Sequence, residues 1–348
     1  MSKLRGLAAY IGLKEYPIEE TKKYLLNAKE YGIDFIFTSF HMPEADIKKD
    51  FDELLSYTEK INLPLVIDIS KGALDLDKLP SNIGALRLDY GFTKQDIVDL
   101  TNNAPYLIEL NASTTTKEYL EELIQMGLNK NNLRISHNFY PKPYTGLGIN
   151  QVLEKNKMFK SFGFDVIAYL PSNSQKRPPL YKGLPTVEEH RNLDLTISSQ
   201  ELFAALCDGV CIGDAYVSNE DIEKILSFED IYELPILIKK NLTENELDIL
   251  KSLHRFRIDE GLYMKRSSTK RGVLVEPHDT ININVFDITI DNNNYLRYKG
   301  EVGIALLPME NVGNVNVVGH IHPDAYTLCE LIKPGSKFKF KIVGTIDE

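Results

Sequence analysis

The stretches LPLVIDIS (63–70), ALRLDYG (85–91) and YLIELNAS (106–113) are short β-type runs, and each carries an acidic residue near its end. Working outward along the chain adds five further runs of this kind: LAAYIGL (7–13), DFIFTSF (34–40), LRISHNFYP (133–141), DVIAYLP (165–171) and GVCIGDAY (209–216). Helix-length segments separate the runs. Eight strands alternating with helices predict an α/β fold, a (β/α)8 barrel, whose active site lies at the carboxyl ends of the strands.

The segments between the runs support this interpretation. PIEETKKYLLNAKEYG (17–32) and TKEYLEELIQMG (116–127) have apolar residues at helical spacing and end in glycine. The gap after the seventh run is longer than the others, and PSNSQKRPPLYKGLPTVEEHRNLDL (171–195) is too rich in proline and polar residues for a simple helix. We expect this loop to cover or complete a site.

A different pattern begins after the eighth run. From about residue 253 to residue 346, short alternating or apolar runs are separated by turn signals, which predicts a small all-β domain and a closed barrel. We therefore divide the chain into a catalytic barrel, 1–240, and a β domain, 241–348. The basic stretch KRSSTKR (265–271) opens the β domain, and we expect Arg266, Ser267 or Arg271 to reach the barrel mouth.

Composition excludes several classes of protein. The chain has 348 residues and a net charge of -10, which argues against general nucleic-acid binding. No apolar run reaches the roughly 18 residues that span a bilayer, and the N-terminus lacks the apolar region of a secretion signal. We expect a cytoplasmic protein with reduced cysteines and no metal or other cofactor, because no Cys/His cluster has zinc spacing.

Alternation along the strands points several charged residues into the barrel. Asp68, Asp89 and Glu109 face inward near strand ends, and converging carboxylates without metal-type histidines suit glycoside hydrolysis. These three are the candidate catalytic residues, and their spacing leaves retaining and inverting chemistry open. In the alternative interpretation, Arg87, Glu109 and Arg134 form a structural ion-pair layer inside the barrel.

Other polar and aromatic residues follow the same strands. The candidate substrate-binding residues comprise strand-end groups, tyrosines for a sugar site and basic residues for an anion: Tyr10, Asn111, His137, Asn138, Tyr140, Lys142, Tyr169, Arg177, Lys182, Arg191 and Asp214. Both Asp214 and His137 have a structural alternative to substrate binding. Asp214 would cap the helix that follows strand eight, and His137 would be a hydrogen-bonded histidine at the rim of the barrel. The loops after strands seven and eight commonly bind phosphate in this fold, so the basic residues predict an anionic substrate.

The runs LRLDYG (86–91), IELNAS (108–113), SHNFYPKPYTGLG (136–148) and NVNVVGHI (314–321), in this order, resemble the bacterial 6-phospho-N-acetylmuramidases. The resemblance implies a barrel followed by a cyclophilin-like β domain. It also implies cytoplasmic cleavage of N-acetylmuramic acid 6-phosphate linked β-1,4 to N-acetylglucosamine, a phosphorylated amino-sugar disaccharide, in cell-wall recycling. The family's acidic positions correspond to Asp68, Asp89 and Glu109, and Lys142 stands where the family pattern has an arginine.

Two other functions compete with this interpretation. A sugar-phosphate aldolase or lyase would form a Schiff base, for which Lys71 follows strand three directly. A non-catalytic carbohydrate-binding protein would need neither the carboxylates nor a nucleophile. Borohydride trapping identifies the first alternative, and release of a free reducing sugar excludes the second.

Overall fold

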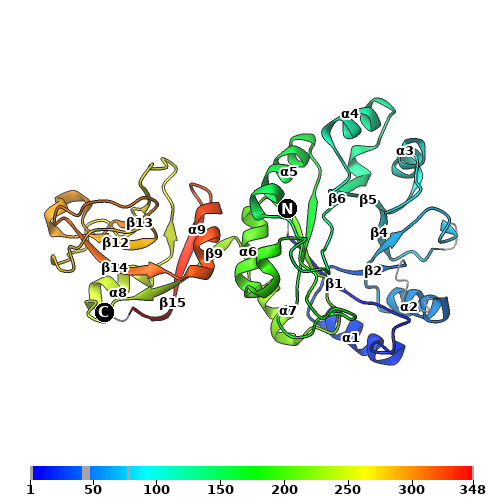
Figure 1. Ribbon diagram of the computed structural model, residues 1–348, viewed down its shortest axis with the longest axis horizontal. Helices are drawn as coiled ribbons and strands as arrows, with labels where there is room; N and C mark the ends of the chain where they lie inside the picture. Colours follow the sequence, from blue (N-terminus) through cyan, green and yellow to red (C-terminus); the bar gives the residue numbers. More distant parts are fainter. Residues whose placement is uncertain (1–2, 41–47, 77–78, 347–348) are drawn as a thin grey trace. The chain divides into compact units, whose positions relative to one another are not determined.

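The first unit of the computed structural model is a closed parallel barrel (Figure 1). The structure describes residues 3–40, 48–76 and 79–346. Eight strands follow one another around the barrel in chain order: β1 (Leu4–Ala8), β2 (Phe35–Ser39), β3 (Leu65–Ile69), β4 (Ile83–Leu88), β5 (Leu107–Asn111), β6 (Leu133–Ser136), β7 (Val166–Leu170) and β8 (Gly209–Ile212). The predicted α/β fold with its eight strands is confirmed, although β1 begins three residues before the predicted run.

Helices cover the outside of the barrel. They are α1 (Ile18–Glu30), α2 (Lys48–Lys60), α3 (Lys94–Asn103), α4 (Lys117–Gln125), α5 (Ile149–Phe162), α6 (Leu195–Ala204) and α7 (Asn219–Leu226), with short 3-10 turns η2 (Lys130–Asn132) and η3 (Glu188–Asn192). Hydroxyl caps start several of them: the side chain of Thr93 accepts a hydrogen bond from the Asp96 amide, and that of Thr116 from the Tyr119 amide. The helices in turn bury apolar residues such as Leu120 and Leu123 against the strands.

The second unit is a mixed seven-stranded sheet with the strand order β10-β15-β9-β14-β12-β13-β11. Its strands are β9 (Ile231–Ile238), β10 (His254–Arg255), β11 (Met264–Ser267), β12 (Asp287–Asp291), β13 (Val302–Ala305), β14 (Val315–Ile321) and β15 (Lys337–Thr345). Its helical segments are α8 (Glu244–Leu250), η4 (Asn293–Tyr298), η5 (Pro323–Ala325) and α9 (Tyr326–Leu331). The Arg257 amide donates to the Arg266 carbonyl at 2.9 Å and links the two ends of the sheet, so the sheet is nearly closed.

The division between the units falls between Ser227 and Phe228, before the predicted boundary at 240. The strand β9 accounts for the difference, because it lies between β15 and β14 in the second sheet. The predicted boundary depended on local sequence, whereas the partners of β9 come from about 80 to 110 residues further along the chain.

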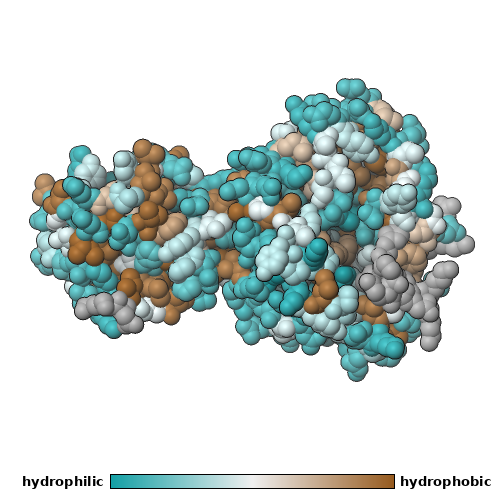
Figure 2. Space-filling model, in the orientation of Figure 1, coloured by the Kyte–Doolittle hydropathy of each residue, from teal (hydrophilic) through white to brown (hydrophobic). Residues whose placement is uncertain are grey.

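Hydrophilic side chains dominate the visible surface of the barrel, while hydrophobic side chains gather on the visible face of the second unit (Figure 2). Among the described residues, no helix combines the length and apolar character that would let it cross a membrane.

Candidate active site

The inward side chains of strands β3 to β6 form a belt of alternating charge. The strand register pairs Asp68 with Arg87, Arg87 with Glu109, and Glu109 with Arg134. All four side chains are buried, so each charge needs a partner of opposite sign. Because the register places them side by side, the four side chains form one continuous strip across strands β3 to β6.

Two ion pairs divide this belt. Arg87 Nη1 donates to Asp68 Oδ1 at 2.7 Å, and Arg134 Nε donates to Glu109 Oε1 at 2.7 Å. Arg87 also donates from Nε to Ser136 Oγ at 2.9 Å and from Nη2 to Asn138 Oδ1. Arg87 thereby connects β3 with the end of β6, whereas Glu109 and Arg134 bind each other.

The three candidate carboxylates have different surroundings. Asp68 is 9% exposed and also accepts a hydrogen bond from Ser39 Oγ at 3.3 Å, while Glu109 is 1% exposed. Asp89 follows β4 and is exposed. Its carboxylate makes no hydrogen bond or ion pair with any residue in the part of the chain that the structure describes. Of the three carboxylates, Asp89 is thus exposed to solvent, Asp68 is almost buried, and Glu109 is fully buried.

Aromatic residues fill the barrel beside this belt. Tyr169 on β7 packs edge-on against Phe37 and Phe139, each with a ring-centroid distance of 5.2 Å. The Tyr10 hydroxyl donates to the Gly213 carbonyl at 2.7 Å, and burial raises the pKa of both tyrosines. The guanidinium of Arg177 lies 4.7 Å from the centre of the Tyr10 ring and 5.6 Å from that of Phe139. Phe139 lies within the HNFYP run but was not among the predicted site residues.

Asp214, after β8, anchors the long loop that carries Arg177. Its Oδ1 accepts the Arg177 backbone amide at 2.7 Å and its Oδ2 accepts the Ser172 amide at 2.9 Å. The carboxyl is fully buried, and burial raises its pKa. Asp214 is thus bound to the loop after β7, and the helix cap of α7 is Ser218.

A second anchor joins the loops after β6 and β7. Arg191 donates to both oxygens of Glu188, at 2.7 and 2.8 Å, and to the carbonyl oxygens of Lys182, Gly183 and Tyr140 at 3.0 to 3.1 Å. Glu188 also accepts the amides of Tyr144 and Gly146, and Arg191 lowers its pKa to about 2. A Cβ on Gly146 would lie 2.7 Å from Glu188 Oε2, which explains the glycine in the TGL run.

The remaining predicted residues are distributed around these anchors. His137 is fully buried and its Nε2 bonds Asn156 of α5 at 2.8 Å; burial lowers its pKa to about 4. Asn111 Oδ1 accepts the Ser113 amide at 2.9 Å, and the Ser113 hydroxyl lies 3.3 Å from the Tyr140 hydroxyl. Lys142 and Lys182 are exposed. His137 is therefore a neutral group facing α5, and its partner Asn156 had no signal in the sequence.

The lysine of the aldolase alternative and the residues of the KRSSTKR stretch also have defined positions. Lys71 Nζ binds Asp96 Oδ2 at 2.6 Å, which lowers the pKa of Asp96 to about 2. In the second unit, Ser267 Oγ lies 3.1 Å from His254 Nδ1, and Arg271 forms an ion pair with Glu301. Among the described residues, no three His, Cys, Asp or Glu side chains gather in a way that would hold a metal ion.

The first unit is a (β/α)8 barrel with acidic residues at or near the carboxyl ends of its strands. Two family models together match almost the whole chain: the N-terminal region of the 6-phospho-N-acetylmuramidases over residues 5–227, and their C-terminal region over residues 232–341. The chain belongs to the 6-phospho-N-acetylmuramidase family, which acts on a phosphorylated muramic-acid substrate.

Two solved structures are similar over nearly their full length. One is the crystal structure of an uncharacterized Bacillus cereus protein, with 28% identity, a TM-score of 0.84, and coverage of 98% of this chain and 100% of that chain. The other is a conserved protein of unknown function from a locus in Enterococcus faecalis, with 29% identity, a TM-score of 0.72, and coverage of 98% and 96%. No curated protein matches the chain.

Proposed function

We propose that this enzyme hydrolyses the β-1,4 bond between N-acetylmuramic acid 6-phosphate and N-acetylglucosamine, in the cytoplasm and as part of cell-wall recycling. The match of both family regions across the chain is the observation that carries this proposal. The reaction needs an acid and a second carboxylate on either side of the scissile bond, together with groups that hold the phosphate.

Asp68 and Asp89 are the best supported pair of reacting carboxylates. Asp89 follows β4 and its amide donates to the Ile69 carbonyl at 2.9 Å, so it lies beside the end of β3. It is two residues beyond Arg87, the register partner of Asp68. A strand spacing of about 4.8 Å and a rise of about 3.3 Å per residue put the two Cα atoms roughly 8 Å apart. Their side chains are long enough to approach one glycosidic bond from two sides.

The surroundings of the two residues support different roles. Arg87 holds a permanent positive charge 2.7 Å from Asp68, which favours a charged carboxylate that acts as nucleophile or general base. Asp89 is exposed, so the leaving-group oxygen of a bound disaccharide can reach it. We assign Asp89 as the general acid and Asp68 as its charged partner. Glu109 then supports the belt through Arg134.

The substrate's anionic groups have candidate partners on the loops after β6 and β7. Arg177 lies over two aromatic rings, and Lys142 and Lys182 are exposed on the same pair of loops. The guanidinium of Arg191 binds Glu188 and backbone carbonyls. We propose that Arg177 binds the phosphate, that both lysines assist, and that Arg191 holds the loops in position. Asn111, Asn138 and Tyr140 are then left for the sugar hydroxyl and acetamido groups.

Leaving-group dependence tests the two roles. Asp68→Asn and Asp89→Asn should each lower turnover of the natural disaccharide by roughly 10²- to 10⁴-fold, because each removes a proton-transfer or charge-stabilising group. On 4-nitrophenyl β-N-acetylmuraminide 6-phosphate, whose leaving group needs no protonation, Asp89→Asn should recover most of its rate and Asp68→Asn should not. Initial rates of both substrates give the comparison.

The matched control for this test is Asp99→Asn, on the outer helix α3, which should leave both rates unchanged. Recovery by Asp68→Asn instead of Asp89→Asn would reverse the two roles. Near-normal turnover of the disaccharide by both variants would move the chemistry to Glu109, and Glu109→Gln would then show the large loss.

A further inference from the structure

The second unit contains a pocket of about 330 Å³, and its lining includes none of the residues assigned to the proposed hydrolysis. Its floor is one face of the sheet, where the register makes Arg266 the partner of Gly303, and Asp291 the partner of Val315. The loop with Met309 and the turn η4 form its walls. This volume lies at the lower end of the range for small-molecule sites, so the pocket fits one compact ligand.

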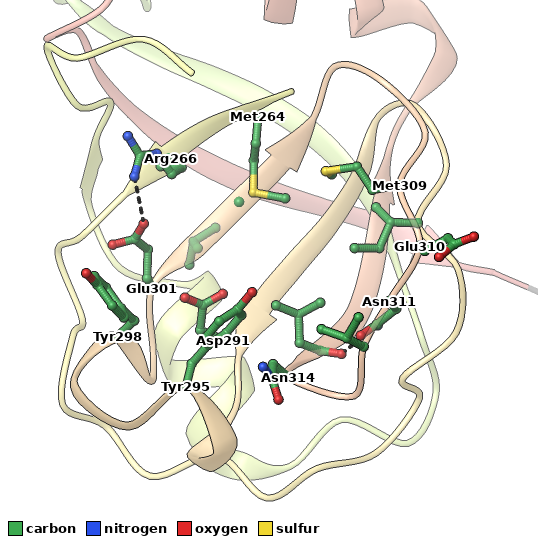
Figure 3. A pocket seen from close by; sticks show the side chains of 15 residues that line it. Met264, Arg266, Asp291, Tyr295, Tyr298, Glu301, Met309, Glu310, Asn311 and Asn314 are labelled. Atoms are coloured by element: carbon green, nitrogen blue, oxygen red, sulfur yellow. Dashed lines mark hydrogen bonds and ion pairs between the residues drawn. The ribbon is translucent and has the colours of Figure 1, made fainter. Parts of the chain in front are cut away.

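Apolar and polar groups lie at different ends of the pocket. Met264 and Met309 lie at one end, and Asp291, Tyr295 and Asn314 at the other (Figure 3). The thioether of Met264 packs directly on the backbone of Gly303, because a Cβ atom added to Gly303 would clash with the Met264 sulfur. Ile283 and Val315 add to the apolar surface. Methionine side chains adapt to ligands of irregular shape, so this end suits an apolar body.

The polar end has a negative charge without a partner. The Asp291 carboxylate makes no hydrogen bond or ion pair with any residue in the ranges that the structure describes. Glu301 differs, because it forms ion pairs with Arg271 and, at 3.9 Å, with Arg266. Arg266 in turn donates to Asp259 at 3.1 Å. Both arginines are therefore already shared with other carboxylates.

The other polar groups at this end also favour a cation. The Asn314 side chain and the Tyr295 hydroxyl have no hydrogen-bond partner among the described residues, and Glu310 on the rim is exposed. A tyrosine ring and a carboxylate side by side offer an ammonium group both a π-face and a charge. An anion would instead meet three carboxylates: Asp291, Glu301 and Glu310.

We propose that this pocket binds a small amine, an ammonium group on an apolar or aromatic body, with the ammonium on Asp291 and the body over Met264, Met309 and Ile283. Asn314 and Tyr295 accept the remaining hydrogen bonds of the ammonium. The residues that line this pocket all belong to the second unit, and none is assigned a role in the proposed reaction.

The protonation of Asp291 gives the site a pH dependence. Burial and the nearby Glu301 raise the pKa of Asp291 to about 7, against the opposing effects of Arg271 and Arg266. The other ionisable groups that line the pocket are Glu310, Tyr295 and Tyr298. Because an ammonium binds the charged carboxylate, affinity should fall as the pH is lowered from 8 to 6. Simple alkylamines remain protonated throughout this interval.

Calorimetric titration of the full chain with 2-phenylethylamine tests the proposal. The amine should bind saturably with one site per chain at pH 8, and 2-phenylethanol and phenylacetate should bind at least tenfold more weakly. Asp291→Asn should weaken amine binding at least tenfold and remove its dependence on pH. Asp248→Asn, on the exposed face of α8 and outside the pocket, should leave binding unchanged.

A second variant covers the case in which Asp291→Asn fails to fold. Asn314→Ala changes only a loop side chain and should weaken amine binding several-fold. Absence of saturable amine binding to the unaltered chain, tighter binding of phenylacetate, or equal affinity in both pocket variants and the unaltered chain would each overturn the proposal. None of these results bears on glycosidase activity, so failure here and failure of the proposed function remain distinguishable.

Discussion

Asp68 and Glu109 inside the barrel each bind an arginine, whereas Asp291 in the second unit has no such partner among the described residues. Asp214 in the barrel is fully buried but accepts two backbone amides. Asp291 is only partly buried, yet burial and the charge of Glu301 raise its pKa to about 7. These three barrel carboxyls thus have hydrogen-bond or ion-pair partners, and Asp291 has none among the described residues.

The contrast separates two uses of a carboxyl group. A paired carboxylate stays charged and fixed in position, which suits catalysis on a bond that must be held still. An unpaired carboxyl destabilises the folded chain when it is charged, and a cationic ligand relieves that cost. The pairing of Asp68 therefore suits a fixed catalytic group in the barrel, and the unpaired Asp291 suits a group that binds a cation in the second unit.

Removing a partner inside the barrel should have the largest effect on stability. Arg134→Met leaves Glu109 buried without its counter-charge, and should lower the free energy of unfolding of the barrel by about 3–5 kcal/mol. The double variant Glu109→Leu/Arg134→Met should recover most of this loss, because no charge remains buried. Urea unfolding of the full chain measures both changes.

The same pair of variants also tests the role of Glu109. If Glu109 only supports the belt, the double variant should regain activity together with stability. Recovered stability without activity would make Glu109 a catalytic residue and would contradict the assignment of Asp68 and Asp89 as the reacting pair. Equal stability of Arg134→Met and the unaltered chain would remove the energetic contrast between the two units.

Charging Asp291 should have an intermediate effect. Its pKa rises from 3.8 to about 7 on folding, so the folded chain binds the proton more tightly than the unfolded chain does. The resulting stability is complete below about pH 4 and is lost as the pH rises through 7. At pH 8, Asp291→Asn should be more stable than the unaltered chain by about 2 kcal/mol, a value reduced for partial exposure.

Urea unfolding at pH 4 and pH 8 measures this prediction. The two proteins should have similar stabilities at pH 4 and diverge at pH 8, while Asp248→Asn should follow the unaltered chain at both. A stability difference that does not change with pH would show that Asp291 is already compensated in the folded chain, and the contrast with Asp68 would disappear.

Strand-level features of the fold were predictable because they are local. Each barrel strand lies within or overlaps a short, largely apolar run, and LPLVIDIS contains β3 (Leu65–Ile69) with Asp68 one residue before its end. The inward direction of Arg87 and Glu109 followed from strand alternation, and both are buried as register partners. The existence of a charged layer could thus be predicted from the period of two residues.

Partner choice within the layer was not predictable from these signals. Whether Arg87 binds Asp68 or Glu109 depends on register and side-chain direction across three strands, and no local pattern specifies them. Arg191 shows the same limit, because its partners lie on the loops after β6 and β7. His137 turns toward α5 because Asn156 offers the bond that satisfies it. The strand β9 joins the second sheet through partners far along the chain.

The smallest predicted effect concerns the phosphate, and it compares two arginines of one loop that have different surroundings. Arg191 binds Glu188 and several carbonyls, whereas Arg177 lies over the rings of Tyr10 and Phe139. Arg177→Ala should lower kcat/KM for the phosphorylated disaccharide by about tenfold, or roughly 1.4 kcal/mol, and change that for the dephosphorylated disaccharide little. Its effect should appear in turnover as well as affinity, because binding energy from the phosphate is used in the transition state.

Arg191→Ala provides the matched comparison, since it should lower activity on both disaccharides in parallel and also lower stability by freeing Glu188. Lys60→Ala, at the end of α2, should change neither substrate's kinetics. Kinetics of the two disaccharides with all three variants measure the ratio of their kcat/KM values. A lower ratio in Arg191→Ala with no change in Arg177→Ala would exchange the roles of the two arginines. Equal rates on both disaccharides in the unaltered enzyme would refute the phosphate requirement itself, and with it the interpretation of the long loop as an anion site.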